Sequence, residues 1–160
     1  MPIKQVTPIQ AIQDYLMLSL ERRQKAILYN LNYVGEQCIN HARSTDSYKD
    51  QTGNLRSSIG YVLVEDGNII QQSDFKQEPP KAEKQIGHTY DGGKTGEQFA
   101  REIAEEHRAG ICLIVVAGMN YASYVAAKGY DVLDSAETMA EWLVPKLIKQ
   151  LGYGLDEIDW

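Results

Sequence analysis

The sequence predicts one α+β domain spanning 1–160. In it, a long N-terminal helix, a middle helix and a C-terminal helix pack on a mostly antiparallel sheet. Three observations predict this fold: a proline-free helical pattern over residues 9–43, strand-like apolar runs at 59–64 and 111–117, and two later capped helical patterns. The order helix, hairpin, helix, strand, short strand, helix is typical of helices packed on an antiparallel sheet. A hydrophobic content of 43% in 160 residues is enough for a core.

Residues 1–45 form the predicted N-terminal helical segment. Thr7 can cap it, Pro8 suits the first helical position, and Gln10 can complete a capping box. Apolar residues recur on one face, at Ile12, Leu16 and Leu20 and then at Ile27, Leu31, Val34 and Cys38. A single helix over this span would be about 50 Å long. Because that exceeds the width of such a domain, we expect either a bend near residues 19–23 or an arm that leaves the globule.

The predicted sheet begins after a polar loop at residues 41–51. Ile59, Tyr61 and Leu63 alternate with other residues, which indicates a half-buried strand. Asp66-Gly67 is typical of a tight turn, and residues 68–72 then form the returning strand of a hairpin. The run 111–117 is continuously apolar, so we expect it to be the most buried strand, covered on both faces.

Two further helices are predicted from their caps. Residues 95–98 repeat the capping-box pattern and start a helix through His107. Its inner face would carry Phe99, Ala100, Ile103, Ala104 and His107. Residues 131–133 form a short strand or turn. Asp134 and Glu137 then cap the final helix, which Pro145 should bend and Gly152 should end.

The segment 73–94 is the longest stretch without a regular pattern. It contains two prolines and few large apolar residues, so burial alone cannot offset the entropy of ordering it. We predict a flexible loop that becomes ordered against a partner, with four lysines facing acidic groups there: Lys76, Lys81, Lys84 and Lys94. A solvent-exposed insertion without a partner is the alternative.

The octapeptide Thr52-Gly53-Asn54-Leu55-Arg56-Ser57-Ser58-Ile59 lies between the first helix and the first strand. Gly53 and Asn54 can adopt the positive φ that most residues avoid. Leu55 and Ile59 are apolar anchors on either side of Arg56. Taken alone, the octapeptide predicts a helix-to-strand connection.

Composition excludes several broad classes of protein. A formal charge of -6 argues against a general nucleic-acid binder, which needs a basic surface. Cys38 and Cys112 fall in apolar periodic segments and are expected to be reduced core residues, with a single disulfide as the alternative. Neither a signal-peptide pattern nor an apolar run of about 18 residues is present, so we expect a soluble protein made in the cytoplasm.

One short motif favours phosphate chemistry. Gly92-Gly93-Lys94-Thr95 precedes a predicted helix, as in a phosphate-binding loop, and a small phosphate- or nucleotide-binding protein is the alternative function. The loop motif needs a further glycine at position 88, where His88 stands. The histidines and cysteines lack metal-pair spacing. We therefore predict no catalytic residue, no metal ligand and no cofactor, and hence no enzyme.

Tyrosine is the most frequent aromatic residue, with 10 copies against 2 Phe and 2 Trp. Tyr121, Tyr124 and Tyr130 lie in one stretch. Tyrosine combines an apolar ring with a polar hydroxyl and is favoured at protein contacts. These side chains are predicted either to bind a partner or to lie half-buried at the edge of the core.

Two segments together resemble a known family. Residues 52–59 are similar to the Thr-Gly-Asn-Leu-Arg-x-Ser-Ile stretch of the head–tail joining proteins of long-tailed bacteriophages and prophages, also called neck or tail-completion proteins. Asn120-Tyr121-Ala122-Ser123-Tyr124-Val125 resembles that family's Tyr-Ala-x-Tyr-Val segment. The chain departs from the family at residues 49–51, where Pro-x-Asp is common, and at Ala126, where a glutamate is common.

The resemblance implies a non-enzymatic structural protein of the virion. Members of the family form rings, commonly of six copies, between the head connector and the tail. DNA passes through the ring without specific binding. The implied partners are further copies of the chain and the neighbouring connector and tail proteins, met in the host cytoplasm during assembly and then in the virion. No membrane is implied.

Overall fold

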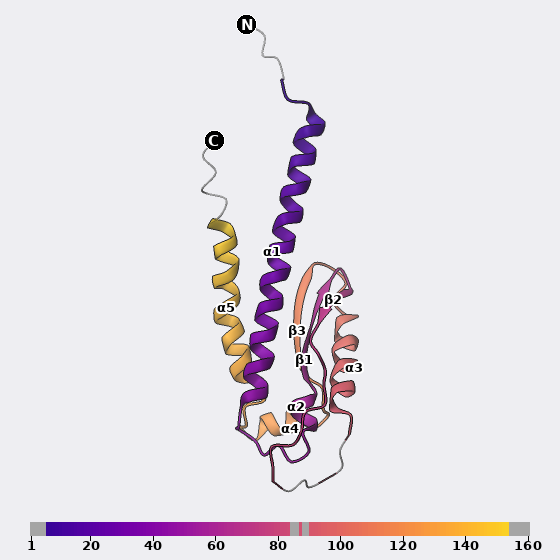
Figure 1. Cartoon of the computed structure of the whole chain (residues 1–160), viewed down its shortest axis with the longest axis vertical. Helices are drawn as coiled ribbons and strands as arrows, with labels where there is room; N and C mark the ends of the chain where they lie inside the picture. The colour runs from indigo at the N-terminus through magenta and orange to yellow at the C-terminus, as the bar shows by residue number, and fades with distance from the viewer. Residues whose placement is uncertain (1–5, 84–86, 88–89, 154–160) are drawn as a thin grey trace.

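The computed structural model describes residues 6–83, 87 and 90–153, and it confirms the predicted α+β class (Figure 1). In chain order the elements are α1 (Ile9–Ser44), α2 (Asn54–Ser57), β1 (Ile59–Glu65), β2 (Asn68–Gln72), α3 (Gly92–Ala104), β3 (Ile111–Ala117), α4 (Ala122–Ala127) and α5 (Asp134–Tyr153). Figure 1 shows α1 and α3 on opposite sides of the sheet, with α5 beyond α1. The short helices α2 and α4 lie together at one end.

The sheet has three antiparallel strands in the order β2-β1-β3. The central strand β1 is buried on both faces as far as Val64, so the prediction that it is half-buried is wrong. The prediction that 111–117 is the most buried strand is also wrong, because β3 is an edge strand and most of its residues are only half-buried. The hairpin is as predicted: Asp66 (φ 48°) and Gly67 (φ 80°) turn the chain from β1 into β2.

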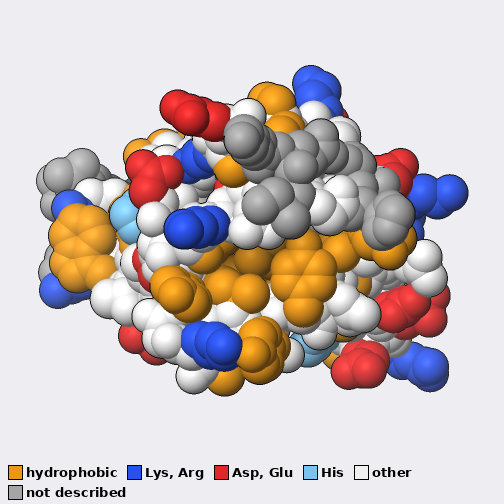
Figure 2. All heavy atoms as spheres, turned by 90° about the horizontal axis from the view of Figure 1, so that it is seen from below, with side chains coloured by type: hydrophobic (Ala, Val, Ile, Leu, Met, Phe, Trp, Pro, Cys, Tyr) orange, Lys and Arg blue, Asp and Glu red, His pale blue; other side chains and the backbone are white. Residues whose placement is uncertain are grey.

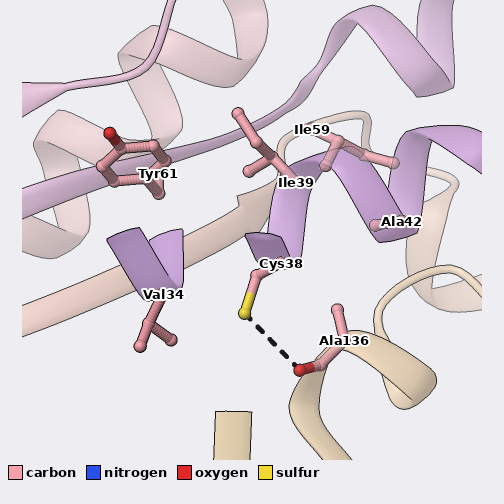
Figure 3. Close-up of a cluster of buried hydrophobic side chains, with 7 residues drawn as sticks. All are labelled: Val34, Cys38, Ile39, Ala42, Ile59, Tyr61 and Ala136. Atoms are coloured by element: carbon pink, nitrogen blue, oxygen red, sulfur yellow. Dashed lines mark hydrogen bonds between the residues drawn. The ribbon is translucent and has the colours of Figure 1, made fainter. Parts of the chain in front are cut away.

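One face of the sheet packs against α1. Figure 3 shows the core there, in which Val34, Cys38, Ile39 and Ala42 of α1 meet Ile59 and Tyr61 of β1 and Ala136 of α5. The Tyr61 hydroxyl lies 2.7 Å from Asn32 Oδ1 and 2.8 Å from Glu36 Oε1, at the edge of this core. Cys38 and Cys112 are both free thiols, and Cys38 Sγ points to the carbonyl of Ala136 at 3.6 Å.

The other face packs against α3. Ala100 and Ala104 meet Val62 and Val64 of β1 together with Ile114 and Val116 of β3. The helix begins at Gly92 and ends at Ala104, so the predicted span of 95–107 is shifted. Asp91 is its cap, since its carboxylate accepts from Lys94 N at 2.9 Å. Phe99 is 41% exposed, and His107 is exposed and lies beyond the end of the helix, so neither belongs to the inner face.

The helix α1 is continuous from Ile9 to Ser44, so a break near residues 19–23 is absent. Its N-terminal half stands clear of the sheet in Figure 1. The predicted capping box is wrong: Pro8 occupies the cap position without a side-chain bond, and Gln10 bonds Asp14 at 3.0 Å instead. The polar loop that follows begins after Ser44 rather than at residue 41.

The last helix, α5, packs along α1. Asp131 Oδ1 accepts from Ser135 N at 3.1 Å, so Asp131 bonds the first turn in place of the predicted Asp134. Residues 131–133 form a bend and not a strand. The helix continues through Pro145 and past Gly152 to Tyr153.

Candidate partner-binding groove

The two segments that carry the family resemblance meet in space. Leu55 packs with Met119 and Ala122 in one buried cluster. Ser58 bonds the two residues that precede the second segment, because its carbonyl accepts from Gly118 N at 3.1 Å and its hydroxyl accepts from Met119 N at 3.2 Å. Segments about 60 residues apart in the sequence therefore form one local structure at the end of the sheet.

A left-handed residue and a buried ion pair shape the first segment. Gly53 has φ 75° and precedes the single turn of α2, as its sequence predicts, whereas Asn54 lies inside that turn and Asp66 is the one described non-glycine residue with positive φ. The carboxylate of Asp50 accepts from Gly53 N at 2.9 Å. Its other oxygen lies 3.0 Å from Arg56 Nε, and both side chains are almost fully buried. The contact is an ion pair without hydrogen-bond alignment.

The first segment also holds the long loop. Arg56 Nη2 donates to Pro79 O, and Ser57 Oγ accepts from Glu78 N at 2.7 Å. At the far end of the loop, the side-chain oxygen of Asn54 accepts from Tyr90 N at 3.2 Å. The described residues of the loop are thus fixed to α2 at both ends. Residues 84–86 and 88–89 lie outside the described residues, so the predicted flexibility of 73–94 stays a prediction.

A groove of about 720 Å³ opens beside these two segments. Tyrosines line it, namely Tyr48, Tyr90, Tyr121, Tyr124 and Tyr130. Thr52, Asn54 and Leu55 form part of its wall. Among its described lining residues Lys49 and Lys128 are basic, and Asp46 and Asp50 are acidic. Figure 2 views the end of the molecule at which α2 and α4 lie, and it shows hydrophobic side chains around a hollow with Lys or Arg side chains beside them.

Burial in the groove raises the pKa of two of its tyrosines. Burial, and then the negative charge of Asp50, raises the pKa of Tyr48 to about 12. Burial also raises the pKa of Tyr121. Lys128 Nζ lies 4.7 Å from the centroid of the Tyr124 ring, a cation–π distance. Aromatic rings, hydroxyls and charged side chains of both signs give the groove the mixed chemistry that is typical of a protein contact.

The predicted site residues divide between the groove and the core. Tyr121 and Tyr124, 36% and 60% exposed, line the groove as partner-binding candidates should. Gly53 and Arg56 both contact the carboxylate of Asp50. Ile59 belongs to the core under α1. Tyr48, Tyr90 and Lys128 were not predicted from the sequence, because they come from three separate segments and share no spacing.

The four predicted lysines do not form one surface feature around the groove. Lys76 pairs with Asp74, and Lys81 Nζ lies 2.7 Å from Asp46 Oδ1, so both already have acidic partners within the chain. Lys94 is exposed in the first turn of α3. Lys84 lies outside the described residues. That these lysines face acidic groups of a partner stays a prediction.

The first turn of α3 is occupied by the chain's own acceptors. Gly92 N donates to Gln77 Oε1 at 3.1 Å, and Lys94 N donates to the carboxylate of Asp91. A phosphate bound there would compete for these donors and meet the negative charge of Asp91. A Cβ on Gly92 or Gly93 would clash with the backbone of Asn54 or Phe75, so these glycines serve close packing.

Clusters of metal-ligating side chains and membrane-spanning helices are both absent from the part of the chain that the structure describes. There, no cluster of three or more His, Cys, Asp or Glu side chains could hold a metal ion. No described helix is long and apolar enough to cross a membrane. No family model matches the chain, and no curated protein or solved structure matches it significantly.

Proposed function

We propose that this protein is a structural component of the head–tail connector of a long-tailed bacteriophage or prophage. Copies of the chain would form a ring around the DNA channel and join or complete head and tail during assembly. The protein would act without a cofactor or catalysis, in the host cytoplasm and then in the virion. Its partners would be further copies of itself and the adjacent connector and tail proteins. DNA would pass through the ring without being specifically bound.

One observation carries the proposal: the two segments that resemble the family pack against each other and form the wall of one groove. If the two short motifs resembled the family by chance, they would have no reason to pack against each other. The packing of the two segments supports a shared role in recognising a partner. The acidic character of the chain is compatible with a channel that must let DNA slide.

The groove is the surface we assign to a neighbouring virion protein. Its tyrosines offer rigid, partly apolar contact area at low entropic cost, and their hydroxyls can bond a passing backbone. Lys49 and Lys128 would attract acidic groups on that neighbour. The anchored loop forms part of the rim through Gly87 and Tyr90.

Particles of the phage that encodes the chain provide the test. A tagged copy should appear in electron micrographs at the neck, between capsid and tail. Tyr124→Ala should leave the protein folded but reduce head–tail joining, so that free heads and free tails accumulate. Tyr33→Ala, a comparably exposed tyrosine on α1, is the matched control and should assemble normally. A tag found elsewhere in the particle, or absent from it, would refute the proposal.

The phosphate-binding alternative has less support, because Asp91 and Gln77 already use the donors of the first turn of α3. It predicts that ATP raises the melting temperature of the protein and that Lys94→Ala removes the effect. We expect no shift with ATP in either protein.

A further inference from the structure

The N-terminal half of α1 presents an apolar surface that the described part of one copy leaves open. We call residues 9–20 the arm. Seven large apolar side chains there are 44% to 66% exposed: Ile9, Ile12, Tyr15, Leu16, Met17, Leu18 and Leu20. The arm extends beyond the sheet in Figure 1. A helix segment that is apolar on most of its surface is normally buried against another element.

The arm continues a stripe that is buried lower down. Ile12, Leu16 and Leu20 follow one another every four residues and are in line with Val34 and Cys38. The lower part of this stripe packs against the sheet and α5. The same face is therefore a packing face in one half of the helix and open in the other.

A second apolar feature lies in the body of the molecule. A groove of about 620 Å³ runs between α1, β3 and α5. It is lined mainly by Leu31, Leu113, Val115, Ala140, Val144 and Ile148, and Glu137 is the one charged residue among its described lining. Cys112 of β3 borders it, but the Cys112 side chain packs on the α3 side of the sheet with Ile114 and Val116. We call this feature the body groove, to separate it from the tyrosine-lined groove.

We propose that the arm of one copy docks in the body groove of a second copy. The arm cannot reach its own body groove, because α1 is one unbroken helix that contributes Ile27 and Leu31 to that groove. Four of the seven side chains, Ile9, Ile12, Leu16 and Leu20, share one face of the helix. Burial of about 100 Å² of each would cover about 400 Å² on the arm and a similar area in the groove, a contact at the small end of specific interfaces that a ring repeats at every junction. Arg22 and Arg23 at the base of the arm complement Glu137 in the groove.

This contact joins different surfaces of the two copies. A contact of that kind leaves a free arm on one copy and a free groove on the other, so it adds further copies and closes into a ring when the rotation allows. The inference thus rests on the self-assembly part of the proposed function and names the surfaces that produce it.

Disulfide trapping tests the contact once a thiol is placed in the groove. Ala140→Cys provides that thiol, in a Cys112→Ser background that removes the native thiol on the α3 side of the sheet. Ile12→Cys, Leu16→Cys and Leu20→Cys place a second thiol on the arm, one helical turn apart. Under mild oxidation at least one of them should give covalent dimers and higher multimers, and restoring Ala140 should abolish them. Ile70→Cys on β2, which is 41% exposed, is the matched control and should remain monomeric on a non-reducing gel.

Two outcomes would overturn the inference. Cross-links that persist when position 140 is Ala would mean that arms pair with arms or with another surface. Absence of cross-links from all three positions, with Leu16→Glu leaving the sedimentation coefficient of the wild type unchanged, would mean that the arm makes no self-contact. Incorporation of the tagged protein at the phage neck is a separate measurement. Cross-links without neck incorporation would refute the proposed function alone. Neck incorporation without cross-links would refute the arm contact alone.

Discussion

At the scale of single residues, Gly53 determines how the chain passes from the first helix to the sheet. Its φ of 75° is strained for any residue with a Cβ, and a Cβ there would also clash with the carbonyl oxygen of Glu78. The positive φ was predictable from the Gly-Asn pair in the sequence. The close approach of the long loop was not, because it comes from residues about 25 positions away.

Gly53→Ala should therefore destabilise the protein by about 3 kcal/mol, since backbone strain and the clash with Glu78 add together. Gly129 is the matched control, because it has φ 83° and a Cβ added there would meet nothing within 4 Å. Gly129→Ala should cost about 1 kcal/mol. Urea unfolding of both variants measures the difference, and equal losses would show that the loop does not press on Gly53.

Tyr48 links the groove to stability at alkaline pH. Its pKa is raised by burial to about 12 in the folded protein, against about 10 in an unfolded chain. Between these values the unfolded state binds fewer protons than the folded state, so the free energy of unfolding falls as pH rises. Below about pH 10 both states keep the proton and Tyr48 adds no pH dependence.

Tyr48→Phe should reduce the decrease in the free energy of unfolding with rising pH by up to about 1.4 kcal/mol per pH unit between about pH 10 and 12. Urea unfolding across that range provides the measurement. Tyr29→Phe, on the exposed side of α1, should retain the slope of the wild type. Parallel curves for Tyr48→Phe and the wild type would contradict the assignment.

At the scale of elements, sequence periodicity located the helices and strands, but it predicted β3 to be the most buried strand and β1 to be half-buried, which is the reverse of the structure. Alternation at Ile59, Tyr61 and Leu63 suggested one covered face, yet Gly60 is also buried and α3 covers Val62 and Val64. The apolar run of β3 suggested a central strand. Which strand is central depends on pairing, and pairing is a long-range property that a local pattern does not contain.

Small residues set how closely α3 approaches the sheet. Gly96 faces the carbonyl of Ser58, and Gly118 at the end of β3 packs against Gly96 itself. Three elements thus come together without side chains between them. The capping-box pattern at 95–98 concealed this role, because Gly96 there looks like a neutral position between the two capping residues.

Gly96→Ala should lower the free energy of unfolding by at least about 2 kcal/mol, because the clash with Ser58 outweighs a gain in helix propensity of about 1 kcal/mol. Gly152→Ala, in the last turn of α5 with open space around it, should be neutral or slightly stabilising. Thermal and urea unfolding report both effects. A stabilised Gly96→Ala would show that α3 can move away from the sheet without loss.

At the scale of the whole molecule, the layers were more predictable from the sequence than the surfaces. The α+β class, the hairpin and the long helix followed from local patterns. The tyrosine-lined groove did not, because its walls come from separate parts of the chain, including the loop before β1 and the segment around α4. The sequence showed two of its parts separately, the stretch with Tyr121, Tyr124 and Tyr130 and the octapeptide at 52–59, but not that they line one groove.

The same division between body and arm predicts a graded pattern of amide hydrogen exchange. Amides of β1 should exchange only through global unfolding, because this strand is central and buried on both faces. Amides of the arm should exchange fastest among the helices in dilute solution, since nothing in the described chain packs over most of that half of α1. In concentrated solution the arm should become protected as it docks on a second copy, whereas the exposed strand β2 should keep its rates and provides the internal control. Arm amides that are equally slow at both concentrations would show that the arm is stable as an isolated helix and that its protection does not depend on assembly.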